Sequence, residues 1–329
     1  MLSPDASVDA PVDAAVAPNP LTPDRLSGTG LCVDAACTQI AAGVRTFAPR
    51  WPLWTDGAVK ERWIWLPPGK KIDNSDPNHW RFPVGTKLWK SFTVNGKRLE
   101  TRYLVKLDTG DNHWFLVAYA WNDAQNEAVA VPRGQDNAGG TNHDIPSRAD
   151  CRQCHDRVPG GVLGFSALAL DYAAPGTNLD LEELASAGLL TAALPGSGSP
   201  RYPLPAGRNA QETQYAAEAV GYLHMNCGHC HNPDSPVYAG SPLELRLTTN
   251  MLSSWPATTV YTTAVGVTTP AMIDGASIII KPAAPDESVV IKRMNHANPA
   301  IRMPAIGTEV VDASAQTLLR AWINSLPVN

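Results

Sequence analysis

The chain contains two pentapeptides of one pattern, Cys151-Arg152-Gln153-Cys154-His155 and Cys227-Gly228-His229-Cys230-His231. Together they use four of its six cysteines. Two cysteines three positions apart lie on one side of a helical turn, so both can form thioethers to one porphyrin, and the next histidine can direct its ring at the iron. Cys-x-x-Cys-His is the attachment pattern of c-type haem. The sequence therefore predicts two covalently bound haem c groups, held by Cys151, Cys154, Cys227 and Cys230, with His155 and His231 as iron ligands.

Two other uses of paired cysteines fit this pattern less well. In a structural zinc site, two Cys-x-x-Cys pairs typically lie about 15 to 20 residues apart, and a much longer segment separates Cys154 from Cys227. A thioredoxin-like redox pair does not require a histidine after its second cysteine. Both pairs have one here. We therefore favour haem attachment over zinc binding or dithiol chemistry.

Covalent haem predicts an extracytoplasmic location, in the periplasm or at the cell surface. The sequence shows no secretory signal, so we expect a processed form of the chain. Cys32 and Cys37 flank a short loop, and an oxidising compartment favours a disulfide between them. The net charge of −5 and pI of about 5.9 argue against nucleic acid or an anionic membrane surface as partner. No apolar run is long enough to span a membrane.

Composition and pattern divide the 329 residues into four segments. They are a flexible tail (1–24), a Trp-rich β domain (25–140), a first haem-binding segment (141–208) and a helical domain with the second haem (209–329). The expected fold class is α+β, with an N-terminal antiparallel, sandwich-like β domain followed by predominantly helical haem domains.

The β assignment of 25–140 depends on strand and turn patterns. Asn95-Gly96 is a two-residue hairpin signal between the apolar runs 88–94 and 99–107. A third strand, 114–121, is apolar on both faces and should lie centrally or between packed layers. The segment holds eight tryptophans, which fill a core or, alternatively, form a carbohydrate-binding platform: Trp51, Trp54, Trp63, Trp65, Trp80, Trp89, Trp114 and Trp121. We favour the core.

Two helices are predicted in the last segment. Asn209 and Glu212 form an N-cap and capping-box pair, followed by a buried stripe that runs towards Cys227. A second amphipathic helix follows Asp312, and the two helices should cross. The apolar stripes are Ala216, Val220 and Leu223 in the first helix, and Ala315, Leu318, Leu319, Trp322 and Ile323 in the second.

An attachment helix, an Arg302-Met303-Pro304 loop and a closing helix together resemble the class I cytochrome c domain. In that family the loop methionine is the sixth iron ligand, which implies Met303 opposite His231. A thioether favours Fe(II), and the following proline stiffens the loop. Methionine as core filler is the usual alternative, and Met294 is the second candidate ligand.

The wider sequence resembles a family of bacterial dihaem c-type cytochromes. The resemblance implies electron transfer with redox protein partners, an exported sugar or alcohol dehydrogenase being one candidate donor. It covers nearly everything from about residue 28 onwards. The resembling stretches are Pro-Leu-Trp-Thr-Asp-Gly-Ala from Pro52, Trp80 to Lys87, Ile145-Pro146, Tyr222-Leu223-His224 and Arg302-Met303-Pro304.

The sixth ligand of the first haem is open, because no Met or His lies between His155 and the second haem helix. An upstream His143, His113 or His79 could close the iron, His224 or Met225 could reach across from the second haem helix, or the iron could be five-coordinate. His143 is preferred, since it precedes the attachment turn and Asp144 could orient its ring. For His229 we expect a structural role.

Three functional classes follow from two unequal haems. The preferred one is an electron carrier that passes single electrons between exported partners. The second is a peroxidase-like oxidoreductase with an open first haem. In the third, the Trp-rich domain targets the carrier to a surface or glycan. Haem attachment alone supports the first class, whereas an enzyme also needs an open iron and acid–base groups beside it.

Overall fold

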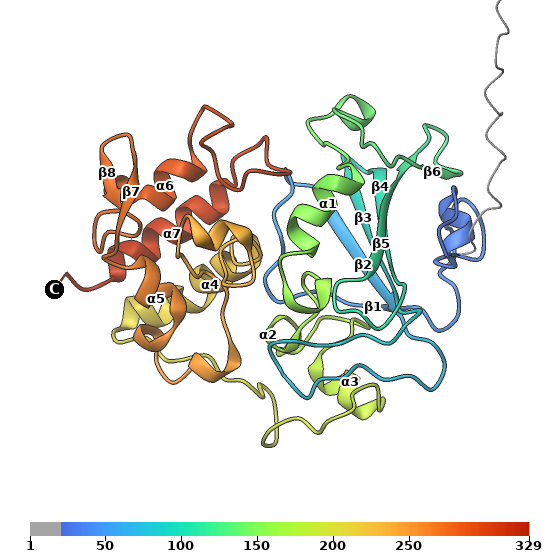
Figure 1. Cartoon of the computed structure of the whole chain (residues 1–329), viewed down its shortest axis with the longest axis horizontal. Coiled ribbons are helices and arrows are strands. Elements are labelled where there is room, and N and C mark those ends of the chain that lie inside the picture. Colours follow the sequence, from blue (N-terminus) through green and yellow to red (C-terminus); the bar gives the residue numbers. More distant parts are fainter. Residues whose placement is uncertain (1–20, 329) are drawn as a thin grey trace, which may run out of the picture.

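The computed structural model describes residues 21–328, in two parts that lie side by side (Figure 1). The sheet part contains β1 (Arg45–Thr46), β2 (Val59–Trp65), β3 (Lys87–Val94), β4 (Lys97–Lys106), β5 (Trp114–Trp121), β6 (Ala128–Ala130), α1 (Arg148–His155), α2 (Ala167–Leu170) and α3 (Leu181–Ser186). The helical part contains α4 (Ala210–Asn226), α5 (Thr259–Ala264), β7 (Thr268–Ile273), β8 (Ala276–Ile278), α6 (Val289–Met294) and α7 (Ala313–Ser325). Among the described residues, no helix is long and apolar enough to cross a membrane.

The six strands β1 to β6 form one antiparallel sheet in sequence order. The β3–β4 turn is the predicted hairpin: Val94 pairs with Lys97, and Asn95 and Gly96 adopt φ of 50° and 77°, which a primed two-residue turn requires. The predicted third strand is β5, between β4 and β6. The α+β class is therefore confirmed.

Both faces of this sheet are covered, but by different kinds of structure. One face, with Trp89 and Tyr103, packs against the N-terminal segment around Leu26 and Leu31. The other, with Leu88, packs against the segment that contains α1 to α3. Within the described residues, both covering layers consist of helix and loop, and neither is a second sheet. The sandwich-like expectation was therefore wrong. Strands that are apolar on both faces require cover on both faces of the sheet, but the strand pattern does not specify what kind of structure provides it.

The tryptophans of this part fill the interior. Six of the eight are buried, and Trp54 and Trp65 are partly buried. Because none of the eight is an exposed ring, the interpretation as core is confirmed.

The packed chain begins before the predicted end of the tail. The backbone oxygen of Pro23 accepts a hydrogen bond from the Tyr119 hydroxyl (2.7 Å), and that of Asp24 accepts one from the Ala130 N–H (2.8 Å). Residues 1–20 of the predicted tail lie outside the described residues. Cys32 and Cys37 form the expected disulfide, with their Cα atoms 5.1 Å apart.

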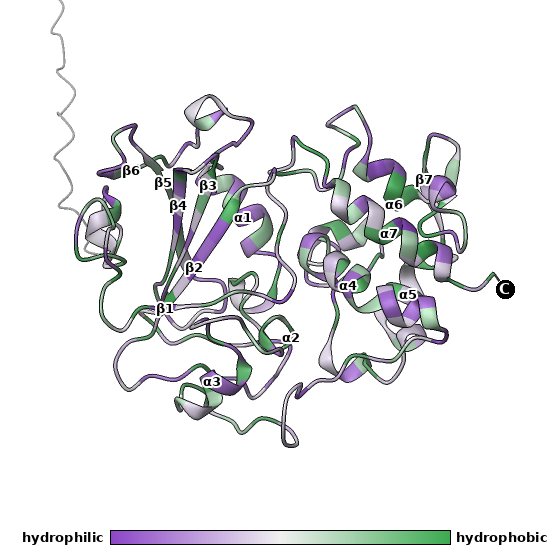
Figure 2. Ribbon diagram, turned by 180° about the vertical axis from the view of Figure 1, so that it is seen from behind, coloured by the Kyte–Doolittle hydropathy of each residue, from purple (hydrophilic) through white to green (hydrophobic). Residues whose placement is uncertain are grey.

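In the helical part, α4 and α7 pack against each other around a common core, as Figure 2 shows from behind. Asn209 caps α4 by accepting the Glu212 N–H at 2.8 Å. The Glu212 carboxylate does not return to the cap residue and instead accepts from Arg208 and from the Tyr261 hydroxyl. The cap was thus predicted correctly, and the reciprocal bond was not.

Candidate functional site

The first pentapeptide forms the end of α1. Ser147 caps this helix: its hydroxyl accepts the Asp150 N–H (3.2 Å), and the Asp150 carboxylate accepts the Ser147 N–H (3.1 Å). This capping box fixes where the helix begins, and it therefore fixes the turn that carries Cys151 and Cys154. Both thiols are partly buried and free.

His155 has the arrangement expected of a metal ligand. Its Nδ1 lies 2.7 Å from the backbone oxygen of Gly161, so Nδ1 carries the proton and donates it, and Nε2 is left as the free lone pair. Burial lowers the pKa of His155 to about 4, which keeps the ring neutral. A backbone carbonyl behind a ligating imidazole is the usual support for such a residue.

The second pentapeptide follows α4 directly, and it is tied to the first. The side-chain amide of Asn232 donates to the backbone oxygens of Gly228 (2.8 Å) and Arg157 (3.1 Å). One buried residue therefore joins the two attachment turns. The Nδ1 of His231 is buried and has no partner among the described residues, and burial lowers the pKa of its ring.

The two attachment turns bring their second cysteines together. The ligand atoms of Cys154, His229 and Cys230 all lie within 4.8 Å of one another, and Arg157 Nη1 lies 3.8 Å from Cys230 Sγ. A hydrogen bond between the two thiols raises the pKa of Cys154 and lowers the pKa of Cys230 to about 3.

This closeness corrects one argument drawn from the sequence. The long segment between Cys154 and Cys227 does not keep the two pairs apart, so sequence separation is no argument against a shared metal site. The residues within reach of one ion are nevertheless one cysteine from each pair and His229, whereas a four-cysteine zinc site would use both members of both pairs. The donor set thus fits zinc only in part.

A cavity of about 270 Å³ lies beside the first attachment turn. Cys151, Cys154 and His155 form part of its wall. Its lining also includes Trp54 and Asn226, the 304–308 loop of the helical part, and a row of basic side chains on β2, β3 and β4. Apolar walls, free thiols and a supported imidazole fit a haem c group, which would be held by the two cysteines and His155.

Met303 and Met294 lie on one smaller cavity of the helical part. Tyr222 and Asp312 line it as well. Met303 is partly buried and donates its backbone N–H to the Arg293 oxygen (3.1 Å), and the Arg293 guanidinium acts on the charge of His231. The structure therefore places both methionines at one cavity, and it does not choose between them as ligand.

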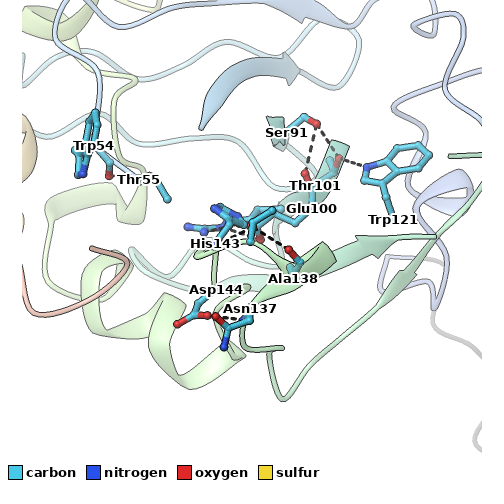
Figure 3. Close-up of polar contacts among 12 residues, drawn as sticks. Trp54, Thr55, Ser91, Glu100, Thr101, Trp121, Asn137, Ala138, His143 and Asp144 are labelled. Atoms are coloured by element: carbon cyan, nitrogen blue, oxygen red, sulfur yellow. Dashed lines mark hydrogen bonds and ion pairs between the residues drawn. The ribbon is translucent and has the colours of Figure 1, made fainter. Parts of the chain in front are cut away.

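His143 is buried in the sheet part, where its ring contacts the carboxylate of Glu100 (Figure 3). Its Nε2 is 2.9 Å from a carboxylate oxygen of Glu100, and its Nδ1 is buried without a partner among residues 21–328. Asp144 accepts the Asn137 N–H (2.7 Å), and the ring's hydrogen bond within residues 21–328 is to Glu100 rather than to Asp144. His143 is not among the residues that line the cavity. Ligation by His143 stays a prediction, and it requires the ring to use Nδ1 or to leave Glu100.

The two other upstream histidines each contact a carboxylate. His79 Nε2 lies 2.7 Å from Asp111 Oδ1, and His113 Nδ1 lies 2.8 Å from Asp108 Oδ1. Neither lines the cavity.

The last two candidates, His224 and Met225, lie near the end of α4. The Nδ1 of His224 accepts the Leu247 N–H at 3.0 Å, so its neutral ring carries the proton on Nε2, which disfavours ligation through that atom. Met225 is buried beside Gly164 in a separate small cavity.

Two features escaped the sequence analysis. His229, for which we expected a structural role, lines the first cavity with its Nδ1 buried and unpartnered among the described residues. The basic row on the cavity wall was also missed, although alternation along β2, β3 and β4 could have revealed it once their register was known. No protein-family model, no curated protein and no solved structure matches this chain.

Proposed function

We propose that this chain is an exported dihaem c-type cytochrome that transfers single electrons between extracytoplasmic redox partners. The observation that carries the proposal is the meeting of two Cys-x-x-Cys-His turns, whose Cys154 and Cys230 sulfurs lie within 4.8 Å. Haem c supplies one-electron chemistry when it is bound. Two groups attached through neighbouring cysteines would be close enough for direct electron exchange.

The chain's own residues would hold and tune these groups. Gly161 fixes the tautomer of His155 through its backbone oxygen, and Asn232 holds the two attachment turns in register. Met303 or Met294 would supply the thioether on the second side of the second iron. The two halves of the site would therefore differ, as a directional carrier requires.

A peroxidase-like oxidoreductase is the second candidate. Within the described part of the chain, the residues that line the first cavity include no methionine, and His229 is their only histidine besides His155. An iron held there would have an open side unless a residue from elsewhere closes it. An open iron is what an enzyme of this class needs.

The first test is the mass of the purified chain after denaturation, from cells competent for haem attachment. Thioether bonds survive unfolding, so we expect two retained haems. The double variant Cys227→Ser/Cys230→Ser is the matched control and should retain one. A chain that carries zinc, or no haem, would contradict the proposal.

A further inference from the structure

Three basic residues stand side by side on neighbouring strands of the sheet. Arg62 on β2 pairs with Lys90 on β3, and Lys90 pairs with Arg102 on β4. Directly paired residues share one face of the sheet, and like charges at such positions repel each other. We call these three residues the basic row. Figure 2 shows β2 and β4 coloured largely hydrophilic although both are interior strands.

The basic row has too few acceptors of its own. Glu100 binds Arg102 (Nη2 to Oε1, 2.6 Å) and is also taken by His143. Arg62 is only 8% exposed, and its Nη2 has no partner among the described residues. Lys90 forms no ion pair within residues 21–328, and its ammonium lies 4.8 Å from the centre of the Phe92 ring. A buried guanidinium nitrogen without an acceptor is costly, unless an anion binds there.

Burial and mutual repulsion act on the charges of this row. Burial lowers the pKa of Arg62 to about 10, and burial followed by the Arg62 and Arg102 charges lowers the pKa of Lys90 well below its usual range. A neighbouring anion would oppose both effects.

All three members of the row line the cavity beside Cys151, Cys154 and His155. Three carboxylates also line it: Asp144 accepts from Asn137, Asp150 accepts from Ser147, and Asp136 is solvent-exposed. None of the cavity's carboxylates forms an ion pair with the row within the described part of the chain. An anion in the cavity would therefore supply the acceptor that the row lacks.

The wall next to the row is apolar. One step along the same face, Ile64 pairs with Leu88 and Leu88 with Leu104, and both leucines line the cavity. The cavity wall is therefore cationic at the basic row and apolar at the adjacent leucines. This combination fits an amphipathic ligand that carries carboxylates at one edge better than it fits a small hydrated ion.

We propose that the basic row is the binding site for the propionate carboxylates of the haem attached at Cys151 and Cys154. The inference rests on the proposed function, and it assigns Arg62 and Lys90, with Arg102, a binding role that the attachment motif does not supply. Arginine and lysine are the side chains expected to bind carboxylates through charge-assisted hydrogen bonds. A free small anion that enters the cavity has the same chemistry, and the experiment separates the two sources.

The experiment compares the loaded protein with Lys90→Met and Arg62→Met, with Lys97→Met as control. Lys97 lies on β4 in an exposed pair with Asp123, so this variant loses the same charge away from the cavity. Denatured mass is measured first and should show two haems in every protein. Absence of haem in the wild type would refute the proposed function rather than the role of the basic row.

With both haems present, redox titration gives the result. A positive charge beside a haem favours the reduced form, so Lys90→Met and Arg62→Met should lower one midpoint potential and leave the other unchanged. Lys97→Met should change neither, and Arg62→Lys should retain most of the wild-type value. Lys90 is partly exposed, so its variant serves if Arg62→Met does not fold. Midpoints equal to those of Lys97→Met would overturn the proposal.

Titration with acetate and with sulfate distinguishes the source of the anion. If propionates occupy the row, the wild-type spectrum and midpoints should show no saturable response to either salt beyond that of sodium chloride. A saturable response that Lys90→Met abolishes would assign the row to a free anion and overturn the propionate assignment.

Discussion

Met294 and Met303 line the same small cavity, yet their surroundings differ. Met294 ends α6, is 5% exposed and belongs to the core of the helical part. Met303 lies in a loop whose backbone is held to Arg293. A core methionine contributes to stability through packing, whereas a loop methionine can be positioned for a ligand. Exchanging each for alanine should therefore have different consequences.

We predict that Met303→Ala lowers the potential of the second haem and opens its iron to added ligands, because the thioether that favours Fe(II) is lost. Met294→Ala should change that potential much less and should cost about 2–5 kcal/mol of stability. Redox titration and thermal unfolding of the two variants measure both effects. An unchanged titration in Met303→Ala would refute Met303 as the ligand and leave Met294 as the next candidate.

At the scale of elements, α4 packs against a residue of the loop that leads into the sheet. Trp51, from the loop before β2, packs into the core of the helical part. A Cβ at Gly221 of α4 would lie 2.1 Å from Cε2 of the Trp51 ring. Glycine in the middle of a helix is unfavourable by itself, so close approach of the indole is the reason for it here.

We predict that Gly221→Ala destabilises the protein by about 1–3 kcal/mol, because the added methyl forces Trp51 away and overpacks the contact. Gly188→Ala is not a suitable comparison, since that residue has positive φ. Ala217→Gly, at a partly buried position of the same helix, controls for propensity and should cost about 1 kcal/mol. Denaturant unfolding measures both. A stabilised Gly221→Ala would show that the indole is not a steric barrier.

At the scale of the whole molecule, both parts contribute to the wall of the first cavity. The sheet supplies the basic row, α1 supplies the attachment turn, and the 304–308 loop closes the cavity from the helical part. In Figure 1, α1 lies between the sheet and the helical part. How the two parts meet would thus decide which residue closes an iron held at Cys151, Cys154 and His155.

Spectroscopy of the whole protein decides between carrier and enzyme. For a carrier we expect low-spin signals from both ferric haems, no response to cyanide and negligible peroxide turnover. The first haem should have the lower potential, as bis-His ligation predicts. Loss of one low-spin signal in His143→Ala, but not in His113→Ala on the exposed Asp108 pair, would identify His143 as ligand. A high-spin first haem that turns over peroxide would establish the enzyme instead.

Some features of this chain follow from short stretches of sequence alone. The Asn95-Gly96 turn, the Asn209 cap, the helix after Asp312 and the apolar stripes of α4 and α7 were all predicted. The reason is that hydrogen bonds between near neighbours and the periods of strand and helix decide them. The two Cys-x-x-Cys-His turns belong to this group, because the spacing that predicts haem attachment lies within five residues.

Only the tertiary structure decided how these local units meet. The closeness of Cys154 to Cys230, the alignment of Arg62 with Lys90 and Arg102, and the contact of His143 with Glu100 join residues far apart in the chain. Strand register and the packing of helices on a sheet determine such contacts, and both depend on the whole core. The sequence by itself therefore determined the attachment turns, and the fold determined which charges, thiols and rings surround them.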